Sequence, residues 1–256
     1  MKQEFVICIP ARYQSTRLPG KPLINIKGKP LIQWAIESAN KLGATEVVVA
    51  TDDKRIFDFV TSLNQKVVMT KSDHQSGTDR ISECAEIMNW PDETLVLNYQ
   101  GDEPLIPKEN IKAVLQLFEQ HKDISIGTLY QEIKTTEDIF NPNMVKIVTD
   151  KNDKALYFSR APIPWSQHLF NHLGTSELPQ NITYKHHIGL YVYRVSFLKA
   201  FTQLSQSDLE TTESLEQLRA LSTGHKIGTA KALLPTPHGI DTPQDILLFE
   251  KKLNHY

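Results

Sequence analysis

Residues 5–29 read FVICIPARYQSTRLPGKPLINIKGK, an apolar run that leads into a long basic loop. The run Phe5–Ile9 is continuously apolar and stops at Pro10, which predicts a short strand buried on both faces. No acidic residue lies between Phe5 and Ile36, whereas five cations do: Arg12, Arg17, Lys21, Lys27 and Lys29. A positive loop directly after a buried strand predicts an anion site at the carboxyl edge of a sheet.

The rest of the first half alternates strand and helix patterns. We expect strands at residues 46–50, 66–69 and 94–98. We expect helices at about 30–42, 79–89 and 107–119. A further helix should be capped by one of residues 51–53 and end at about residue 63. Repeated strand–helix units predict an α/β fold with a mainly parallel sheet flanked by helices. Ligands of such sheets bind beyond the carboxyl ends of the strands, so the loops at 10–22, 70–78 and 98–104 should line one crevice.

The second half is less regular. Residues 124–130, 143–149, 154–158 and 186–193 have strand patterns, and residues 211–223 and 242–253 have helical ones. Residues 161–185 contain three prolines and scattered polar residues, which indicates a long loop or an excursion. Without a repeat or a clean linker, the sequence predicts one domain over residues 1–256 with an excursion in its second half.

Length and composition exclude several classes of protein. The chain has 256 residues, of which 40% are hydrophobic and 23% charged, as in ordinary globular proteins. A formal net charge of −2 argues against a general nucleic-acid coat. No apolar run is long enough to cross a bilayer, and the start of the chain lacks a signal-peptide layout, so we expect a cytoplasmic protein without membrane insertion. Two cysteines cannot form a disulfide framework or a four-thiolate zinc site.

The basic loop suits a polyphosphate better than a single carboxylate. Several cations, Ser and Thr hydroxyls and backbone N–H groups can share the charge of a triphosphate. The loop matches neither the P-loop nor the Gly-x-Gly-x-x-Gly dinucleotide turn. On charge alone, a solvated basic loop is an equally good interpretation.

Two acidic segments are candidate metal ligands. Asp102 follows an apolar strand within Gln100-Gly101-Asp102-Glu103-Pro104, where it could bind Mg²⁺ together with phosphate oxygens or simply shape a turn. Asp241 precedes Thr242-Pro243, and Thr242 is the better helix cap because Asp245 stands three residues later. Asp241 is therefore left without a capping role and could supply a second carboxylate, although the spacing does not prove that the two meet.

Other polar candidates also have plausible structural roles. Ser76-Gly77-Thr78-Asp79-Arg80 could read a base edge, but taken alone the segment favours Thr78 as a helix cap with nothing bound. Arg160 stands at a strand end and could clamp a carboxylate or form a surface ion pair. His186 and His187 are adjacent, so in a strand at most one of them faces a site. The nine histidines show no paired metal spacing, and the cysteines have the surroundings of small buried residues.

Taken together, these segments resemble the CMP-Kdo synthetases, also called 3-deoxy-manno-octulosonate cytidylyltransferases. The matching stretches run in family order over nearly the whole chain: residues 9–12, 17–23, 50–53, 74–80, 100–104, 141–143, 155–160, 187–191, 215–219 and 241–243. The resemblance implies a Rossmann-like nucleotidyltransferase fold and a homodimer whose contact, together with sugar binding, lies in an excursion at about 154–210. It also implies transfer of CMP from CTP to Kdo with Mg²⁺, for lipopolysaccharide biosynthesis.

The resemblance assigns roles residue by residue. Nucleotide-binding roles fall on Pro10, Ala11, Arg12, Ser15, Arg17, Lys21, Ser76, Gly77, Thr78 and Arg80. Sugar-acid-binding roles fall on Gln100, Arg160, His187, Tyr191, Glu216 and Gln217. Catalytic roles fall on Lys21, Asp102 and Asp241, the two aspartates being the metal ligands. Tyr99 replaces a small aliphatic residue of the family, which we expect to change packing only, and residues 166–184 match poorly and receive no role.

Three rival functions follow from the same residues. A cytidylyltransferase for a related sugar acid, such as 8-amino-Kdo, would carry the same motifs. A nucleotide-sugar glycosyltransferase also uses an acidic loop after a strand, but it would release no pyrophosphate from CTP. A nucleotide sensor would bind CTP without turnover, and it would not need both carboxylates.

Overall fold

The computed structural model describes residues 4–14, 18–167, 170, 178, 182–236 and 239–253. Its contacts divide the chain into two compact units. The first unit comprises Met1–Lys108, Val192–Thr202 and Pro235–Tyr256, and the second comprises Glu109–Tyr191 and Gln203–Leu234. Among the described residues, no helix combines the length and the apolar character that crossing a bilayer requires.

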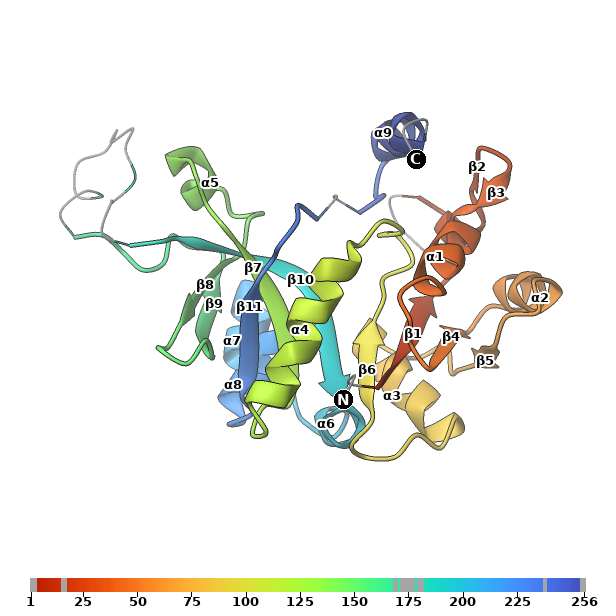
Figure 1. Cartoon of the computed structure of the whole chain (residues 1–256), viewed down its shortest axis with the longest axis horizontal. Helices are drawn as coiled ribbons and strands as arrows, with labels where there is room; N and C mark the ends of the chain where they lie inside the picture. The colour runs from red at the N-terminus through yellow and green to blue at the C-terminus, as the bar shows by residue number, and fades with distance from the viewer. Residues whose placement is uncertain are drawn as a thin grey trace. The chain divides into compact units, whose positions relative to one another are not determined.

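The first unit is built on parallel strands with β1 (Phe5–Ala11) between β6 (Leu95–Asn98) and β4 (Glu46–Thr51), as Figure 1 shows. β5 (Val67–Met69) pairs with β4, also in parallel. β1 carries buried apolar residues on both faces, which explains its continuous apolar sequence. The predicted parallel α/β sheet is therefore confirmed, and the neighbours of β1 on its two sides create the switch point beside which such sheets bind ligands.

The first unit also contains helices. They are α1 (Leu31–Ala39), α2 (Lys54–Ser62), α3 (Gly77–Ile87), α6 (Val195–Phe201) and α9 (Pro243–Leu253). α1 and α3 pack on β1, and α1 buries its Leu31, Ile32, Ala35, Ile36 and Ala39. The expected loop at 11–29 also contains the 3₁₀ helix η1 (Lys21–Leu23) and the hairpin β2 (Asn25–Ile26)–β3 (Lys29–Pro30).

The second unit combines parallel and antiparallel pairs. Its strands are β7 (Ile126–Glu132), β8 (Lys146–Thr149), β9 (Ala155–Ser159), β10 (Lys185–Arg194), which ends in the first unit, and β11 (Ile227–Lys231). β7 pairs in parallel with β11, whereas β8 runs antiparallel to β9 and β10. Its helices are α4 (Lys108–Gln120), α5 (Thr136–Phe140), α7 (Asp208–Glu213) and α8 (Gln217–Ser222).

Several elements differ from the sequence-based expectations. The single helix expected at 211–223 is two short helices, because Ser214 adopts a left-handed conformation with φ 52° between α7 and α8. α5, α6 and β11 were not predicted from the sequence. α3 begins at Gly77 and is capped by Ser76, so the expected cap at Thr78 is wrong. The reason is a capping box in which the Ser76 hydroxyl accepts from the Asp79 N–H while Asp79 accepts from the Ser76 N–H.

Candidate active site

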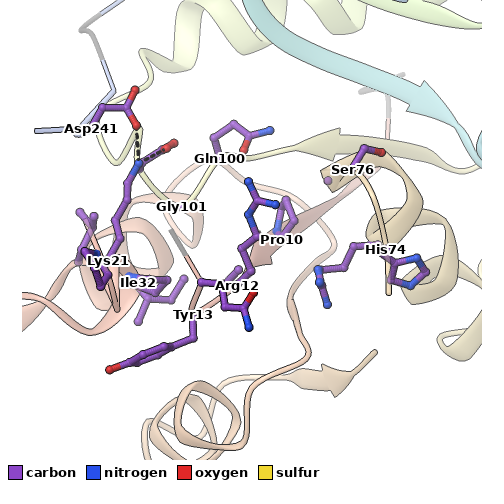
Figure 2. A pocket seen from close by; sticks show the side chains of 18 of the residues that line it. Pro10, Arg12, Tyr13, Lys21, Ile32, His74, Ser76, Gln100, Gly101 and Asp241 are labelled. Atoms are coloured by element: carbon purple, nitrogen blue, oxygen red, sulfur yellow. Dashed lines mark hydrogen bonds and ion pairs between the residues drawn. The ribbon is translucent and has the colours of Figure 1, made fainter. Parts of the chain in front are cut away.

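A cavity of about 850 Å³ opens in the first unit beyond the carboxyl ends of β1 and β6. Residues from all three expected loops line it, together with Asp241 from the segment before α9 (Figure 2). The lining includes ten of the predicted site residues: Pro10, Ala11, Arg12, Lys21, Ser76, Gly77, Arg80, Gln100, Asp102 and Asp241. The convergence expected from a parallel sheet is thus present in the structure.

Lys21 joins the two candidate metal carboxylates. Its Nζ lies 2.5 Å from Asp102 Oδ2 and 2.9 Å from Asp241 Oδ1, although the aspartates are far apart in the sequence (Figure 2). The Lys21 side chain is only 12% exposed, whereas the side chains of Asp102 and Asp241 are 30% and 40% exposed. The structure therefore brings together one shielded cation and two accessible carboxylates at one side of the cavity.

A glycine turn sets the position of Lys21. Gly20 caps η1 with φ 70°, and its N–H donates to the carbonyl of Tyr13. A Cβ on Gly20 would stand 2.9 Å from the Tyr13 ring, which is closer than two non-bonded carbon atoms approach each other. Both the backbone conformation and the close approach therefore require glycine at this position.

Asp241 is held by its own helix and by the acidic loop. Asp245 Oδ2 accepts hydrogen bonds from the N–H of Asp241 at 3.1 Å and of Thr242 at 2.8 Å. The N–H of Ile240 donates to the Asp102 carbonyl at 2.9 Å. Ile240 is buried in an apolar cluster with Ile26, Leu31 and Phe249, and this cluster anchors α9. The Asp241 carboxylate is thus left to face Lys21, as its lack of a capping role predicted.

Glu103 is a functional candidate that the sequence analysis missed. Burial, together with the nearby carboxylates of Asp102 and Asp241, raises the pKa of Glu103 to about 7. Glu103 thus lies close to the two candidate metal carboxylates, and their negative charges add to the effect of its burial. The sequence signal was the second acid in Asp102-Glu103, but burial of that acid cannot be read from spacing.

The polar side chains near α3 are largely engaged in holding the fold. The Arg80 guanidinium is buried and donates to Asp52 Oδ2 at 3.0 Å and to the Thr70 hydroxyl. Ser76 is occupied by its capping box. Thr78 is buried, and it is not one of the residues that line the cavity. Ser15 and Arg17 lie outside the described residues.

The cavity wall also contains a histidine–carboxylate pair that the sequence analysis did not single out. His74 lines the cavity, and its Nε2 lies 2.5 Å from Oε2 of Glu83 on α3. The sequence signal was weak, because a His and a Glu nine residues apart indicate no contact unless the intervening turn into the helix is known. Gln100, in the loop after β6, lines the same cavity, and its side-chain amide donates to Asn98 Oδ1 at 2.9 Å.

Arg160 belongs to the second unit, where a network fixes it. Its Nε donates to the Glu213 carbonyl at 2.7 Å and its Nη1 to the Pro142 carbonyl at 3.0 Å. The Glu213 carboxylate accepts from the Arg160 N–H at 2.9 Å and from the Ser159 hydroxyl at 2.5 Å. The buried Lys146 donates to the Arg160 carbonyl at 2.6 Å. A guanidinium has five N–H donors, so donors remain for a carboxylate ligand.

His187, Tyr191, Glu216 and Gln217 also lie in the second unit. His187 is buried, its Nε2 is 3.0 Å from the Thr128 hydroxyl, and its ring stands edge-to-face with Phe158. Burial, and to a smaller degree the charge of His186, lowers the pKa of His187 to about 3. His187 is therefore a neutral hydrogen-bonding group at physiological pH. Gln217 is buried at the start of α8, and among the described residues its Nε2 has no hydrogen-bond partner.

The acidic residues of the cavity suit a magnesium ion that binds together with a substrate phosphate. Among the described residues, no group of three or more His, Cys, Asp or Glu side chains is arranged to hold a metal by itself. Mg²⁺ is usually bound through one or two carboxylates plus phosphate oxygens of a substrate. Asp102 and Asp241 converge on one cation and stay accessible from the cavity, so their donor set fits Mg²⁺ that arrives with a polyphosphate.

Comparison with known proteins shows the family of this chain. A family model described as cytidylyltransferase matches residues 6–227. A 3-deoxy-manno-octulosonate cytidylyltransferase of Thioalkalivibrio sulfidiphilus is 48% identical over 250 residues, covering 97% of this chain and 98% of the relative. The protein of the same name from Pseudomonas fluorescens is 46% identical and covers 96% of each chain. The chain belongs to the 3-deoxy-manno-octulosonate cytidylyltransferase family.

Solved structures place the fold in the same family. A structure of CMP:2-keto-3-deoxy-manno-octonic acid synthetase complexed with CTP matches with a TM-score of 0.88 at 38% identity, covering 99% of both chains. A cytidylyltransferase from Leptospira borgpetersenii matches with a TM-score of 0.62 at 14% identity, covering 99% of this chain and 88% of that one, which shows the fold alone. The family and fold predicted from the sequence are therefore confirmed.

Proposed function

We propose that this chain transfers CMP from CTP to Kdo and releases pyrophosphate. The observation that carries the proposal is the meeting of Lys21, Asp102 and Asp241 in a cavity of about 850 Å³. This arrangement offers the cation and the carboxylates that nucleotidyl transfer needs around a triphosphate. Relatives named for the reaction, at 46–48% identity over nearly the whole chain, support it.

In the proposed reaction the anomeric hydroxyl of the sugar acid attacks the α-phosphorus of CTP, and the bond to pyrophosphate breaks in line with it. The protein contributes chiefly by positioning the reactants and stabilising charge. Lys21 places its ammonium group where charge grows on the phosphoryl group and on the leaving pyrophosphate. Arg12, which lines the same cavity, adds a second positive charge for the triphosphate.

Asp102 and Asp241 would hold Mg²⁺, which when bound supplies positive charge to phosphate oxygens and acidity to the attacking hydroxyl. We assign Arg160 to the carboxylate of the sugar acid, because its backbone and Nε are already fixed by Glu213. Gln100, His187, Tyr191, Glu216 and Gln217 stay predicted contacts of the sugar acid.

A substrate matrix tests the function. CTP, UTP and ATP are each incubated with Kdo, with 8-amino-Kdo and without acid, and phosphate is detected with malachite green after pyrophosphatase treatment. We expect release with CTP and Kdo that depends on Mg²⁺ and is lost in Asp102→Asn but kept in the matched surface variant Asp58→Asn. Preference for 8-amino-Kdo would favour the related enzyme, and CTP binding without release would reject the enzymatic proposal.

Further proposals rest on the family resemblance. We propose that residues 1–256 act as one cytidylyltransferase domain in a cytoplasmic homodimer, with a contact in residues 154–210, and that its product serves lipopolysaccharide biosynthesis. Light scattering during size-exclusion chromatography tests the dimer, since a monomeric mass at micromolar concentration contradicts it.

A further inference from the structure

The two sides of the cavity offer different chemistry. Figure 2 shows Lys21 and Asp241 on one side and Ser76 and His74 on the opposite side, with Pro10 and Arg12 between them. In the proposed function the triphosphate lies beside Lys21 and the two carboxylates. The base of the nucleotide therefore extends toward the side formed by His74 and the start of α3.

The polar side chains around His74 on that side make hydrogen bonds within the protein. The Ser76 hydroxyl accepts from the Asp79 N–H at 3.1 Å and donates to Asp79 Oδ2 at 3.0 Å. Arg80 is committed to Asp52, Thr70 and the Lys71 carbonyl. Gln75 is exposed, and its amide donates to the Asp73 carbonyl at 2.9 Å.

Among the described residues, hydrogen bonding engages the His74 ring at Nε2 and leaves Nδ1 for a ligand. Glu83 Oε2 lies 2.5 Å from His74 Nε2 and also accepts from the Lys71 N–H at 2.8 Å. Burial raises the pKa of Glu83, but the hydrogen bonds from His74 and Lys71 outweigh it and leave the pKa below its ordinary value. An ionised carboxylate only accepts hydrogen bonds, so Nε2 carries a proton, and in the uncharged form of the ring Nδ1 is then an acceptor.

This polarity distinguishes the two pyrimidines. At the same ring position cytosine presents an amine that donates, whereas uracil, like thymine, presents a carbonyl oxygen that accepts. We propose that His74, held in one tautomer by Glu83, accepts a hydrogen bond from the exocyclic amine of cytosine and so selects CTP over UTP. Glu83 is then a positioning residue, because it acts on the base only through His74. The inference rests on the proposed function for the choice of nucleotide.

Glu83→Gln is the informative substitution. The glutamine oxygen can still accept from the Lys71 N–H, while its amide donates to His74 Nε2 and moves the ring proton to Nδ1. The ring then donates, which suits uracil and opposes cytosine. We expect the ratio of kcat/KM for CTP to that for UTP to fall about ten-fold, the effect of one hydrogen bond made or left unmade in a shielded site.

Two further variants complete the design. His74→Leu removes the acceptor, so it should lower kcat/KM for CTP more than for UTP. Glu86→Gln makes the same chemical change at an exposed position on α3 and should leave the ratio unaltered. A general loss of stability would lower kcat/KM for CTP and for UTP by the same factor, so the ratio separates recognition from folding. Ratios within two-fold of wild type in Glu83→Gln and His74→Leu would overturn the inference.

Binding and spectroscopy make the result independent of turnover. Calorimetric titration of the same variants with CTP and UTP needs no sugar acid, so it tests the base selectivity even if the wild type releases no pyrophosphate with Kdo. In wild-type protein with ¹⁵N-labelled histidine, the His74 Nδ1 resonance should be that of an unprotonated nitrogen and should shift on CTP binding. A protonated Nδ1, or an Nδ1 resonance that does not shift with CTP, would refute the assignment. Because this measurement uses wild-type protein, it holds even if a variant fails to fold.

Discussion

Lys21 is the cation that contacts both candidate metal carboxylates. It lies within 2.9 Å of both carboxylates while its own side chain is largely shielded from water. By analogy with the loss of one donor to a developing anion, Lys21→Ala should reduce kcat about 10²–10³-fold. Steady-state pyrophosphate release at saturating CTP and Kdo measures the effect. Lys54→Ala, which removes a lysine from a solvent-exposed pair with Asp58, is the control and should retain the wild-type rate.

Gly20 is the residue on which the position of Lys21 depends. Its φ of 70° and the 2.9 Å approach of a Cβ to Tyr13 disfavour any side chain. Gly20→Ala should therefore lower kcat/KM for CTP at least about ten-fold, because η1 must shift to relieve the contact. Gly28→Ala also has a positive φ but has open space around its Cβ, so it should have a smaller effect. Equal losses in the two variants would show that backbone strain alone, and not the Tyr13 contact, is responsible.

The site residues that could be predicted share one property. Lys21 lies in the basic loop after the first predicted strand, and Asp102 and Asp241 stand close to predictable elements, so their charge and place in the chain were informative. Glu103 and His74 were missed because their roles depend on burial and on a partner in space. The cap of α3 was assigned to the wrong residue, Thr78 in place of Ser76. A Ser and a Thr two residues apart are both good caps, and only the backbone conformation shows which one begins the helix.

At the scale of elements, the start of α9 connects helix capping to the proposed metal site. Asp245 accepts from the N–H groups of Asp241 and Thr242, and thereby fixes the backbone that carries the Asp241 carboxylate. Asp245→Ala should cost about 1 kcal/mol of stability, as loss of a cap does, and should raise the Mg²⁺ concentration for half-maximal activity. Asp53→Ala removes a comparable capping carboxylate from α2 and should cost stability without changing the Mg²⁺ dependence. An unchanged Mg²⁺ requirement in Asp245→Ala would contradict the coupling.

The turn between α7 and α8 depends on a buried ion pair. Arg219 donates to both carboxylate oxygens of Glu210, at 2.8 and 2.5 Å, and both side chains are at most 10% exposed. Arg219→Met leaves the Glu210 charge buried, so the free energy of unfolding should fall by about 3–5 kcal/mol. The double variant Glu210→Leu/Arg219→Met should recover most of that loss. Urea unfolding measures both, and a double variant no more stable than Arg219→Met would show that the pair itself is essential.

For the whole molecule, the strands with a clear apolar pattern were predictable, including the antiparallel β8, β9 and β10, whereas β11 and the break between α7 and α8 were not. Strands such as β1 and β4 are buried on both faces and therefore read as continuous apolar runs. β11, Ile-Gly-Thr-Ala-Lys, has only a short apolar signal and is defined by its pairing with β7, a contact between distant parts of the chain. The left-handed Ser214 that separates α7 from α8 also has no local signal, because serine fits a helical pattern equally well.

Acid stability is a whole-molecule property that one buried side chain should govern. Burial lowers the pKa of His187 to about 3, whereas in the unfolded chain it returns to near 6.5. Between these values the unfolded state binds the extra proton, so stability is full above pH 6.5 and falls as the pH drops toward 3. The loss should approach about 1.4 kcal/mol per pH unit, added to the contributions of other groups.

His187→Gln isolates this contribution, because glutamine can keep a hydrogen bond to Thr128 but does not titrate. The free energies of urea unfolding at pH 7.0 and pH 5.0 should therefore differ by about 2 kcal/mol less in His187→Gln than in wild type. His121→Gln, at a half-buried position in the turn after α4, is the matched control and should retain most of the wild-type dependence. If His187→Gln loses as much stability as wild type between the two pH values, the neutral state of His187 does not set the acid limit of the fold.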